Sequence, residues 1–277
     1  MPSVQGLSEA ADLVRRLDRE RFVTALFAPP ERREALMVLY AFNAEVARVR
    51  EAVHEPMAGL VRLQWWREVV SGGRSAERHP VAVPLAELIR AHHLPIEPFE
   101  RLLAAREGDL YAAPPEDMAA AESYADDTSG GLTTLAVRLL GGGEEAAAAG
   151  RSVGLAWSLV GQLRALPFAL STGRLTLPVD VLREVDTTPE DVLAGRAPKP
   201  ALAAAAARVG GRAAEHLAMA RRHRAARPAL AALLPAILAS RHLRMLAVAR
   251  WDVFDPRVSI PRANPLRLWI SHAIGQF

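Results

Sequence analysis

The sequence has 277 residues, of which 51% are hydrophobic, and its 34 basic and 31 acidic residues give a formal net charge of +3. This length and apolar content fit one large globular domain, or at most two, and exclude an intrinsically disordered chain. The absence of cysteine excludes disulfides and thiolate metal sites, and it is compatible with a reducing compartment.

The basic residues are almost all arginine, since Lys199 is the only lysine. This bias fits either GC-rich coding or the recognition of phosphates and anionic headgroups, for which arginine is suited. The longest apolar run, Pro228–Ser240, is shorter than the roughly 20 residues that cross a bilayer. The N-terminus lacks the apolar block of a secretory signal. We therefore expect a cytoplasmic protein, with peripheral contact on the inner face of the membrane as an open alternative.

Helical periodicity runs through nearly the whole sequence, with no strand alternation and no fixed-period repeat. Pro29 and Pro30 separate two short helices from a long one, and Ser129–Gly131 interrupts a later stretch that is one helix or two. The helical stretches expected in the first half of the chain are 8–19, 18–27, 31–53, 57–70, 83–92, 97–109 and 118–140.

The second half begins with a long helix from about Glu144 to Gly173. Thr188 is the expected N-cap of a short helix. Two alanine-rich helices over 200–227 and 228–250, an irregular connection over 251–264 and a final amphipathic segment over 265–277 follow. No change of composition marks a domain boundary, so the sequence predicts a single all-α domain over 1–277. The apolar residues at helical spacing in the long helix are Leu155, Leu159, Leu163 and Leu166.

Three segments resemble the squalene and phytoene synthases. The segment Gly154–Pro178 resembles the helix GLxxQLxNxLRDxxED of that family and the GRxYLP motif after it. Residues 18–53 resemble the opening of the family, and Trp251–Val258 resembles its DVFxxRV segment. The resemblance covers about residues 18–258. It implies a single-domain helical bundle of the isoprenoid-synthase type.

The family joins prenyl diphosphates with Mg²⁺ ions, which two clusters of acidic residues hold on facing helices. Only one carboxylate survives in this sequence, and one carboxylate is a poor Mg²⁺ site. Pro167 is expected to kink the second helix as well. The resemblance therefore implies no catalytic residue, no metal and no cofactor. Mg²⁺ is expected only if the protein is an active prenyl transferase. The corresponding positions are Ala47, Arg48 and Glu51 in the first cluster and Gly161, Ala165 and Ala169 in the second.

Motifs within 41–49, 59–66 and 124–128, together with Pro167, resemble a branch of the superfamily that lacks the aspartates. That branch includes mitochondrial complex I assembly factor six. The resemblance implies a pseudoenzyme that helps to assemble a membrane respiratory complex, complex I, through contact with a subunit or another assembly protein. No nucleic-acid partner is expected, because aromatic residues do not alternate with the arginines.

Two alternatives stay open. One is a prenyl transferase of isoprenoid or carotenoid biosynthesis whose anion site is formed by Arg48, Arg62, Arg164 and Arg174. The other is a lipid-binding module that keeps the prenyl cavity without the chemistry. Candidate residues for lining the pocket or binding an anion are Tyr40, Arg62, Gln64, Asp109, Arg164 and Arg174.

Histidines suggest metal ligands at two places, and both have a simpler interpretation. His92 and His93 are neighbours on a helix and point to different faces, so solvent exposure is expected. His216 and His223 lie on a helix that is rich in arginine, which is interpreted as a solvated face rather than a lipid or RNA site.

Overall fold

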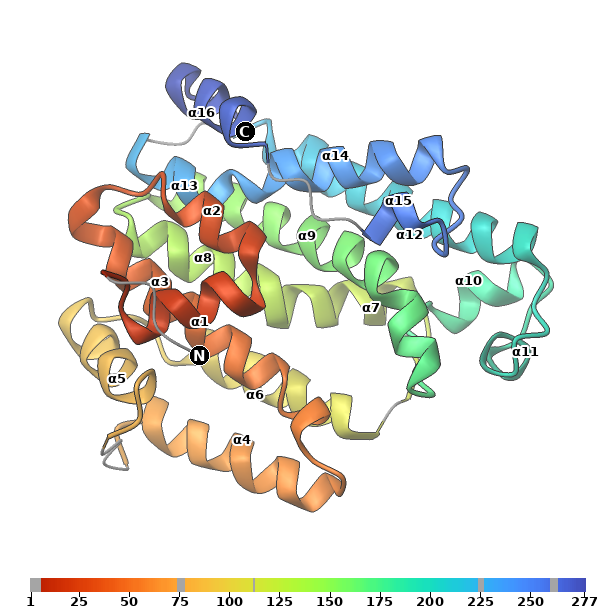
Figure 1. Cartoon of the computed structure of the whole chain (residues 1–277), viewed down its shortest axis with the longest axis horizontal. Helices are drawn as coiled ribbons and strands as arrows, with labels where there is room; N and C mark the ends of the chain where they lie inside the picture. The colour runs from red at the N-terminus through yellow and green to blue at the C-terminus, as the bar shows by residue number, and fades with distance from the viewer. Residues whose placement is uncertain (1–5, 74–77, 112, 224–226, 260–263) are drawn as a thin grey trace.

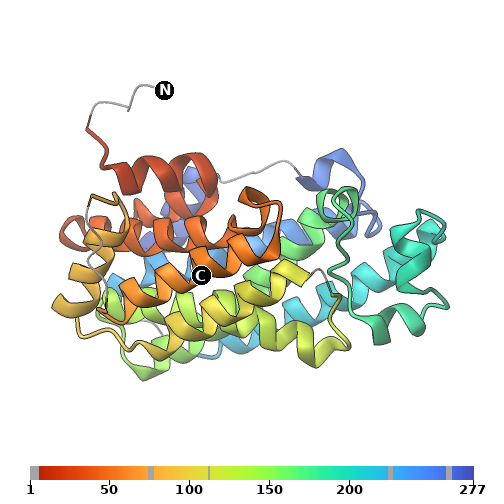
Figure 2. The same cartoon turned by 90° about the horizontal axis from the view of Figure 1, so that it is seen from below.

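The computed structural model describes residues 6–73, 78–111, 113–223, 227–259 and 264–277, and the regular elements of these ranges are all helices (Figure 1). The all-α prediction is confirmed. Helices α10 and α11 lie at one end of the long axis and α5 lies at the other (Figures 1 and 2). One cluster of buried apolar residues extends from α1 to α15.

The bounds of the expected helices agree with the structure to within a few residues except at three places. In the N-terminal half they are α1 Glu9–Leu17, α2 Arg19–Ala25, α3 Pro30–Ala47, η1 Arg50–Ala52, α4 Pro56–Val70, α5 Ala82–Ala91, α6 Glu97–Gly108, η2 Asp109–Tyr111, α7 Met118–Ala125, η3 Asp126–Gly130 and α8 Gly131–Leu139. In the C-terminal half they are α9 Glu144–Ser171, α10 Val179–Arg183, α11 Pro189–Leu193, α12 Lys199–Ala220, η4 Arg227–Ala229, α13 Leu230–Leu233, α14 Pro235–Val248, α15 Pro256–Ser259 and α16 Pro265–Ile274.

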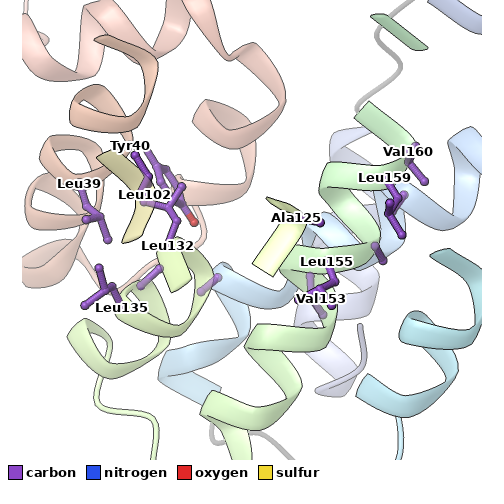
Figure 3. Packing of buried hydrophobic residues seen from close by; sticks show 14 of the residues in the cluster. Leu39, Tyr40, Leu102, Ala125, Leu132, Leu135, Val153, Leu155, Leu159 and Val160 are labelled. Atoms are coloured by element: carbon purple, nitrogen blue, oxygen red, sulfur yellow. The ribbon is translucent and has the colours of Figure 1, made fainter. Parts of the chain in front are cut away.

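Helix α9 runs through the middle of the molecule and packs against α8, α12 and α14 (Figure 1). The predicted apolar stripe is buried, with Leu159 and Leu166 at 0% exposure. Figure 3 shows Leu155, Leu159 and Val160 of this helix among the packed side chains. Gly173 ends the helical turn with a φ of 73°, and the Arg174 amide donates to the Ala169 carbonyl at 2.8 Å.

The interruption expected at Ser129–Gly131 is a π-helical turn, η3, which joins α7 to α8 without a break. The turn brings its backbone against α9. A Cβ added to Gly154 would lie 2.2 Å from the Ser129 carbonyl oxygen. Glycine is therefore required at this position by the close approach of two backbones.

The first discrepancy is in α3, which ends at Ala47 rather than near Val53. Its last bonds shorten to the i→i−3 pattern, with the Arg48 amide donating to Glu45 and the Val49 amide to Val46. A 3-10 turn follows over Arg50–Ala52. Positions 47, 48 and 51 therefore do not share one α-helical face.

The second discrepancy is in the stretch 228–250, which forms η4, α13 and α14 in place of one helix. The third discrepancy is in α12, which ends at Ala220 rather than near Arg227; residues 224–226 lie outside the described residues. The expected irregular connection 251–264 contains the short helix α15, and its residues 260–263 also lie outside the described residues. Helix α9 continues through Pro167 to Ser171. The Thr188 side chain caps α11, as predicted, by accepting from the Asp191 amide at 3.2 Å.

Two helical stretches, Glu144–Ser171 and Arg227–Val248, are long and apolar enough to cross a membrane by length and composition alone. The sequence analysis predicts helices in these regions but no membrane-spanning segment. Half or more of their most apolar windows is buried inside the protein, at 50% and 61%. Core helices of globular proteins meet the same criteria, so this is weak evidence for a span.

A buried polar cluster ties α2 to α9 and α14. Glu20, which is 6% exposed, accepts from Arg164 Nη1 at 2.8 Å and lies 2.7 Å from Nε2 of His242. Burial acts to raise the pKa of Glu20, but the hydrogen bond to His242 and the charge of Arg164 outweigh it, so the pKa lies below its ordinary value of 4.5. The folded protein therefore holds this carboxylate ionised.

Glu20→Gln is expected to lower the stability at neutral pH by about 1–3 kcal/mol, because a charged acceptor of two hydrogen bonds is lost. Since the folded pKa is depressed, the contribution of Glu20 is complete above the unfolded pKa and disappears as the pH falls through the folded pKa. Thermal unfolding between about pH 6 and about pH 3 should thus show a smaller loss of stability in the variant than in the wild type. Parallel curves would contradict this.

Candidate functional site

A cavity of about 650 Å³ lies where the end of α3, the end of α6, α7 and α9 meet. Ala47 and Glu51 reach it from α3 and η1, and Gly161, Ala165 and Ala169 reach it from α9. The structure thus brings together five of the six positions of the two acidic clusters. Arg48 is the exception: it is exposed, with Nε 3.7 Å from Glu51 Oε2.

Three small residues lie on the wall that α9 contributes, where Trp157, Ser158, Gln162 and Phe168 also line the cavity. Gly161, Ala165 and Ala169 are spaced by four residues and therefore share one helical face. A Cβ added to Gly161 would have no neighbour within 4 Å, so this face borders open space rather than a packed helix. An apolar wall with spare volume can accept a chain of methylene groups but cannot bind a cation.

Polar side chains gather at the opposite wall around Asp109. Its Oδ1 accepts from Arg174 Nη2 at 2.9 Å, and its Oδ2 accepts from Arg106 Nη1 at 3.1 Å and from the Tyr124 hydroxyl at 2.9 Å. The Arg106 guanidinium also lies 5.6 Å from the centre of the Tyr124 ring. Both carboxylate oxygens of Asp109 are therefore already occupied by donors.

Burial and the contacts within this cluster together shift the pKa values of Tyr124 and Arg106. It raises the pKa of Tyr124 to about 12, so the phenol stays protonated and donates to Asp109. Burial acts to lower the pKa of Arg106, but Tyr124 and Asp109 outweigh it and the pKa lies above its ordinary value. The guanidinium is charged at any physiological pH.

Three buried donor or acceptor atoms at the cavity are without a hydrogen-bond partner within the described part of the chain: Arg50 Nε, Arg106 Nε and Thr176 Oγ1. With Arg174, the lining holds three arginines against the two carboxylates of Glu51 and Asp109. Buried unpaired donors of positive charge are suited to an anionic oxygen.

Of the six candidate pocket residues, Asp109 and Arg174 lie at the cavity. Tyr40 is buried in the core, where Figure 3 shows it, with the Arg21 guanidinium 5.6 Å from its ring. Arg164 turns away to pair with Glu20. The other two, Arg62 and Gln64, are exposed on α4.

The sequence interpretation missed Arg50, Arg106 and Thr176. Arg50 stands beside a cluster position and Arg106 stands one helical turn before Asp109, which is the only sequence signal for either. Tyr124 lies within the 124–128 motif, but that motif does not indicate a polar contact in the pocket. Its role depends on packing between α6 and α7, which no local pattern encodes.

The donor set does not fit the magnesium cluster that the fold family implies. The carboxylates at the cavity are Glu51, which is exposed, and Asp109, whose oxygens accept from arginine and tyrosine. Within the described ranges, no three His, Cys, Asp or Glu residues lie close enough to hold a metal ion. Mg²⁺ requires several oxygen ligands in octahedral geometry, and this lining does not supply them.

The other histidines have ordinary surroundings. His92 and His93 are exposed, with His92 Nδ1 3.4 Å from Arg32 Nη1. The interpretation of the arginine-rich helix with His216 and His223 as a solvated face is wrong for His216, which is buried and lies 2.9 Å from Glu122. The arginines that follow α12 include Arg221, Arg222 and Arg227, which are exposed, while Arg224 lies outside the described residues.

The structure is thus a helical bundle in which the central helix α9 borders one cavity. The squalene/phytoene synthase family model matches residues 14–264, so the chain belongs to this family. Complex I assembly factor 6 of Mus musculus is 30% identical over 268 residues, which is 94% of this chain and 79% of that protein. The counterpart from Bos taurus is 29% identical over the same shares.

Solved structures support the same fold. Squalene synthase HpnC from Alicyclobacillus acidocaldarius has a TM-score of 0.74 at 22% identity, covering 88% of this chain and 93% of that one. A dehydrosqualene synthase in complex with ligand has a TM-score of 0.80 at 15% identity, covering 96% and 94%. The predicted isoprenoid-synthase-type bundle is confirmed.

Proposed function

We propose that this chain is a non-catalytic squalene/phytoene synthase relative that helps to assemble respiratory complex I. The names of the relatives from Mus musculus and Bos taurus, complex I assembly factor 6, support this function. The proposed place of action is the cytoplasm and the inner face of the membrane, where the chain would contact a complex I subunit or another assembly protein. No nucleic acid is part of the proposal.

The observation that carries the non-catalytic part is the α9 wall of the cavity. The family reaction ionises an allylic diphosphate, and Mg²⁺ neutralises the charge that builds on the leaving group. The three positions of α9 that the resemblance assigns to metal ligands hold Gly161, Ala165 and Ala169. Without acidic groups on this wall, the cavity can bind a molecule but has nothing to hold the ions that drive its ionisation.

The prenyl transferase alternative has less support. The anion site that the sequence suggests for it consists of Arg48, Arg62, Arg164 and Arg174, and the first three do not line the cavity. Arg174 does, but its Nη2 donates to Asp109.

A lipid-binding function is the second candidate, and a specific observation favours it. The cavity of about 650 Å³ has the size of a small-molecule site, and it combines an apolar wall with the unpartnered Nε atoms of Arg50 and Arg106. A phosphate-bearing lipid fits this division of polarity. Such binding is compatible with the assembly function, because a bound lipid would stabilise the folded chain by mass action.

Deleting the gene in the source organism tests the assembly function. The expected result is a severe loss of assembled complex I on native gels, together with its NADH-dependent quinone reduction, while the other respiratory complexes are unchanged. Reintroducing the wild-type chain should restore both readouts. Normal complex I in the deletion strain would refute the proposal.

A further inference from the structure

The C-terminal helix α16, Pro265–Ile274, presents its apolar residues to solvent. Four of its side chains are large, hydrophobic and exposed: Leu266 at 65%, Trp269 at 60%, Ile270 at 46% and Ile274 at 59%. Their spacing of three, four and eight residues places them on one face of the helix. No other helix of the described part of the chain exposes as many large hydrophobic side chains.

The opposite face fixes this orientation. Leu268, which is 1% exposed, packs in a cluster with Leu234, Ile237 and Leu238. The ring of His272 lies 5.5 Å from that of Phe27. Both contacts attach α16 to the body of the protein, so the apolar face cannot turn inward without breaking them.

The surroundings of this face are basic. The stretch 256–277 contains no aspartate or glutamate, and Arg267 lies on α16 itself. Arg221, at the end of α12, donates from Nε to the backbone carbonyl of Phe277 at 3.2 Å, so this exposed arginine lies beside the residues that follow α16. A protein partner of ordinary composition would not require this bias, whereas anionic headgroups complement it.

We propose that α16 is a membrane-docking helix that inserts Leu266, Trp269, Ile270 and Ile274 into the surface of an anionic lipid bilayer. Interfacial helices combine an apolar face with flanking arginines, and tryptophan is favoured at the boundary between headgroups and acyl chains. The helix lies in the plane of the surface and does not cross it, since ten residues are too few to span a bilayer. This inference adds a specific surface to the membrane part of the proposed function, on which it rests.

Sedimentation of the purified full chain with vesicles tests the inference. The vesicles are phosphatidylcholine alone or phosphatidylcholine with one third phosphatidylglycerol. The wild type is expected to sediment with the anionic vesicles, less so at high salt, and weakly with the neutral ones. The double variant Leu266→Glu with Ile270→Glu should lose at least about ten-fold in vesicle affinity, because two apolar side chains no longer enter the bilayer.

The matched control is Met57→Glu with Val61→Glu. These residues have the same spacing and are exposed at 66% and 63% on α4, which lies at the opposite edge of the molecule from α16 (Figure 1). The control should bind vesicles like the wild type. A second readout is the tryptophan emission, whose blue shift should be smaller in Trp269→Phe than in the wild type at vesicle concentrations that bind both proteins fully.

Absence of vesicle binding by the wild type, or equal binding by the α16 variant and the control, would overturn the inference. So would an α16 variant that binds vesicles normally but fails to restore complex I, because the face would then dock a protein. Vesicle sedimentation involves no complex I, whereas the deletion strain reports assembly directly. The failure of one proposal can therefore be told from the failure of the other.

Discussion

The Gly154→Ala variant is expected to unfold at a temperature roughly 6–12 °C below that of the wild type, a loss of about 3 kcal/mol or more. The added Cβ would lie 2.2 Å from the Ser129 carbonyl oxygen and 2.7 Å from the Gly130 Cα. These are backbone atoms of the π-helical turn η3 and cannot rotate away as a side chain can. Either α9 or η3 must move, and both border the cavity. Thermal unfolding followed by circular dichroism measures the effect.

Gly161→Ala is the control for this prediction. Gly161 lies on the same helix, seven residues further on and therefore on nearly the same face, yet a Cβ there would meet no atom within 4 Å. Alanine is favoured over glycine in a helix by up to about 1 kcal/mol, so this variant should be as stable as the wild type or more so. If both variants lose the same stability, the close contact between α9 and η3 is not as described.

The second large effect concerns turnover. An active synthase uses its metal ions to neutralise the leaving diphosphate, and the α9 wall here offers Gly161, Ala165 and Ala169 for that purpose. If the metals supply even ~5 kcal/mol toward the barrier, their absence slows the reaction by roughly 10³–10⁴. We expect release of diphosphate from prenyl diphosphates at the uncatalysed background rate, with or without Mg²⁺, measured against an active synthase.

Much of the fold could be predicted because local signals coincide with the elements. The leucine spacing of α9, the glycine at its end and the Thr188 cap are each determined by residues within a few positions of each other. The meeting of the two degenerate clusters at one cavity followed from the family resemblance rather than from such signals. It could not have been derived from periodicity alone.

The polar contacts could not be predicted, because their partners are distant in the sequence. Glu20 and His242 are separated by 222 residues, and Arg174 reaches Asp109 across 65. Arg164 was expected at the pocket, but a buried carboxylate on α2 holds it elsewhere. The side chain of an arginine is long enough that its Cα position does not determine which acid it pairs with.

The end of α3 could not be predicted from the sequence pattern either. The apolar pattern continues past Ala47 into Val49, so periodicity extends the helix through a segment where the structure tightens into a 3-10 turn. This turn directs Arg48 to solvent and Arg50 to the cavity. The change from α-helical to 3-10 spacing therefore decides whether Arg48 or Arg50 lines the cavity. No simple sequence pattern predicts where this change occurs.

Incubation of the purified chain with farnesyl and geranylgeranyl diphosphate and Mg²⁺, with released diphosphate as the readout, tests most directly whether the cavity binds without reacting. We predict release no greater than that of a heat-denatured sample, and no increase when Mg²⁺ is raised. Metal-dependent release well above that background, abolished by substituting Glu51 or Asp109, would contradict the non-catalytic account.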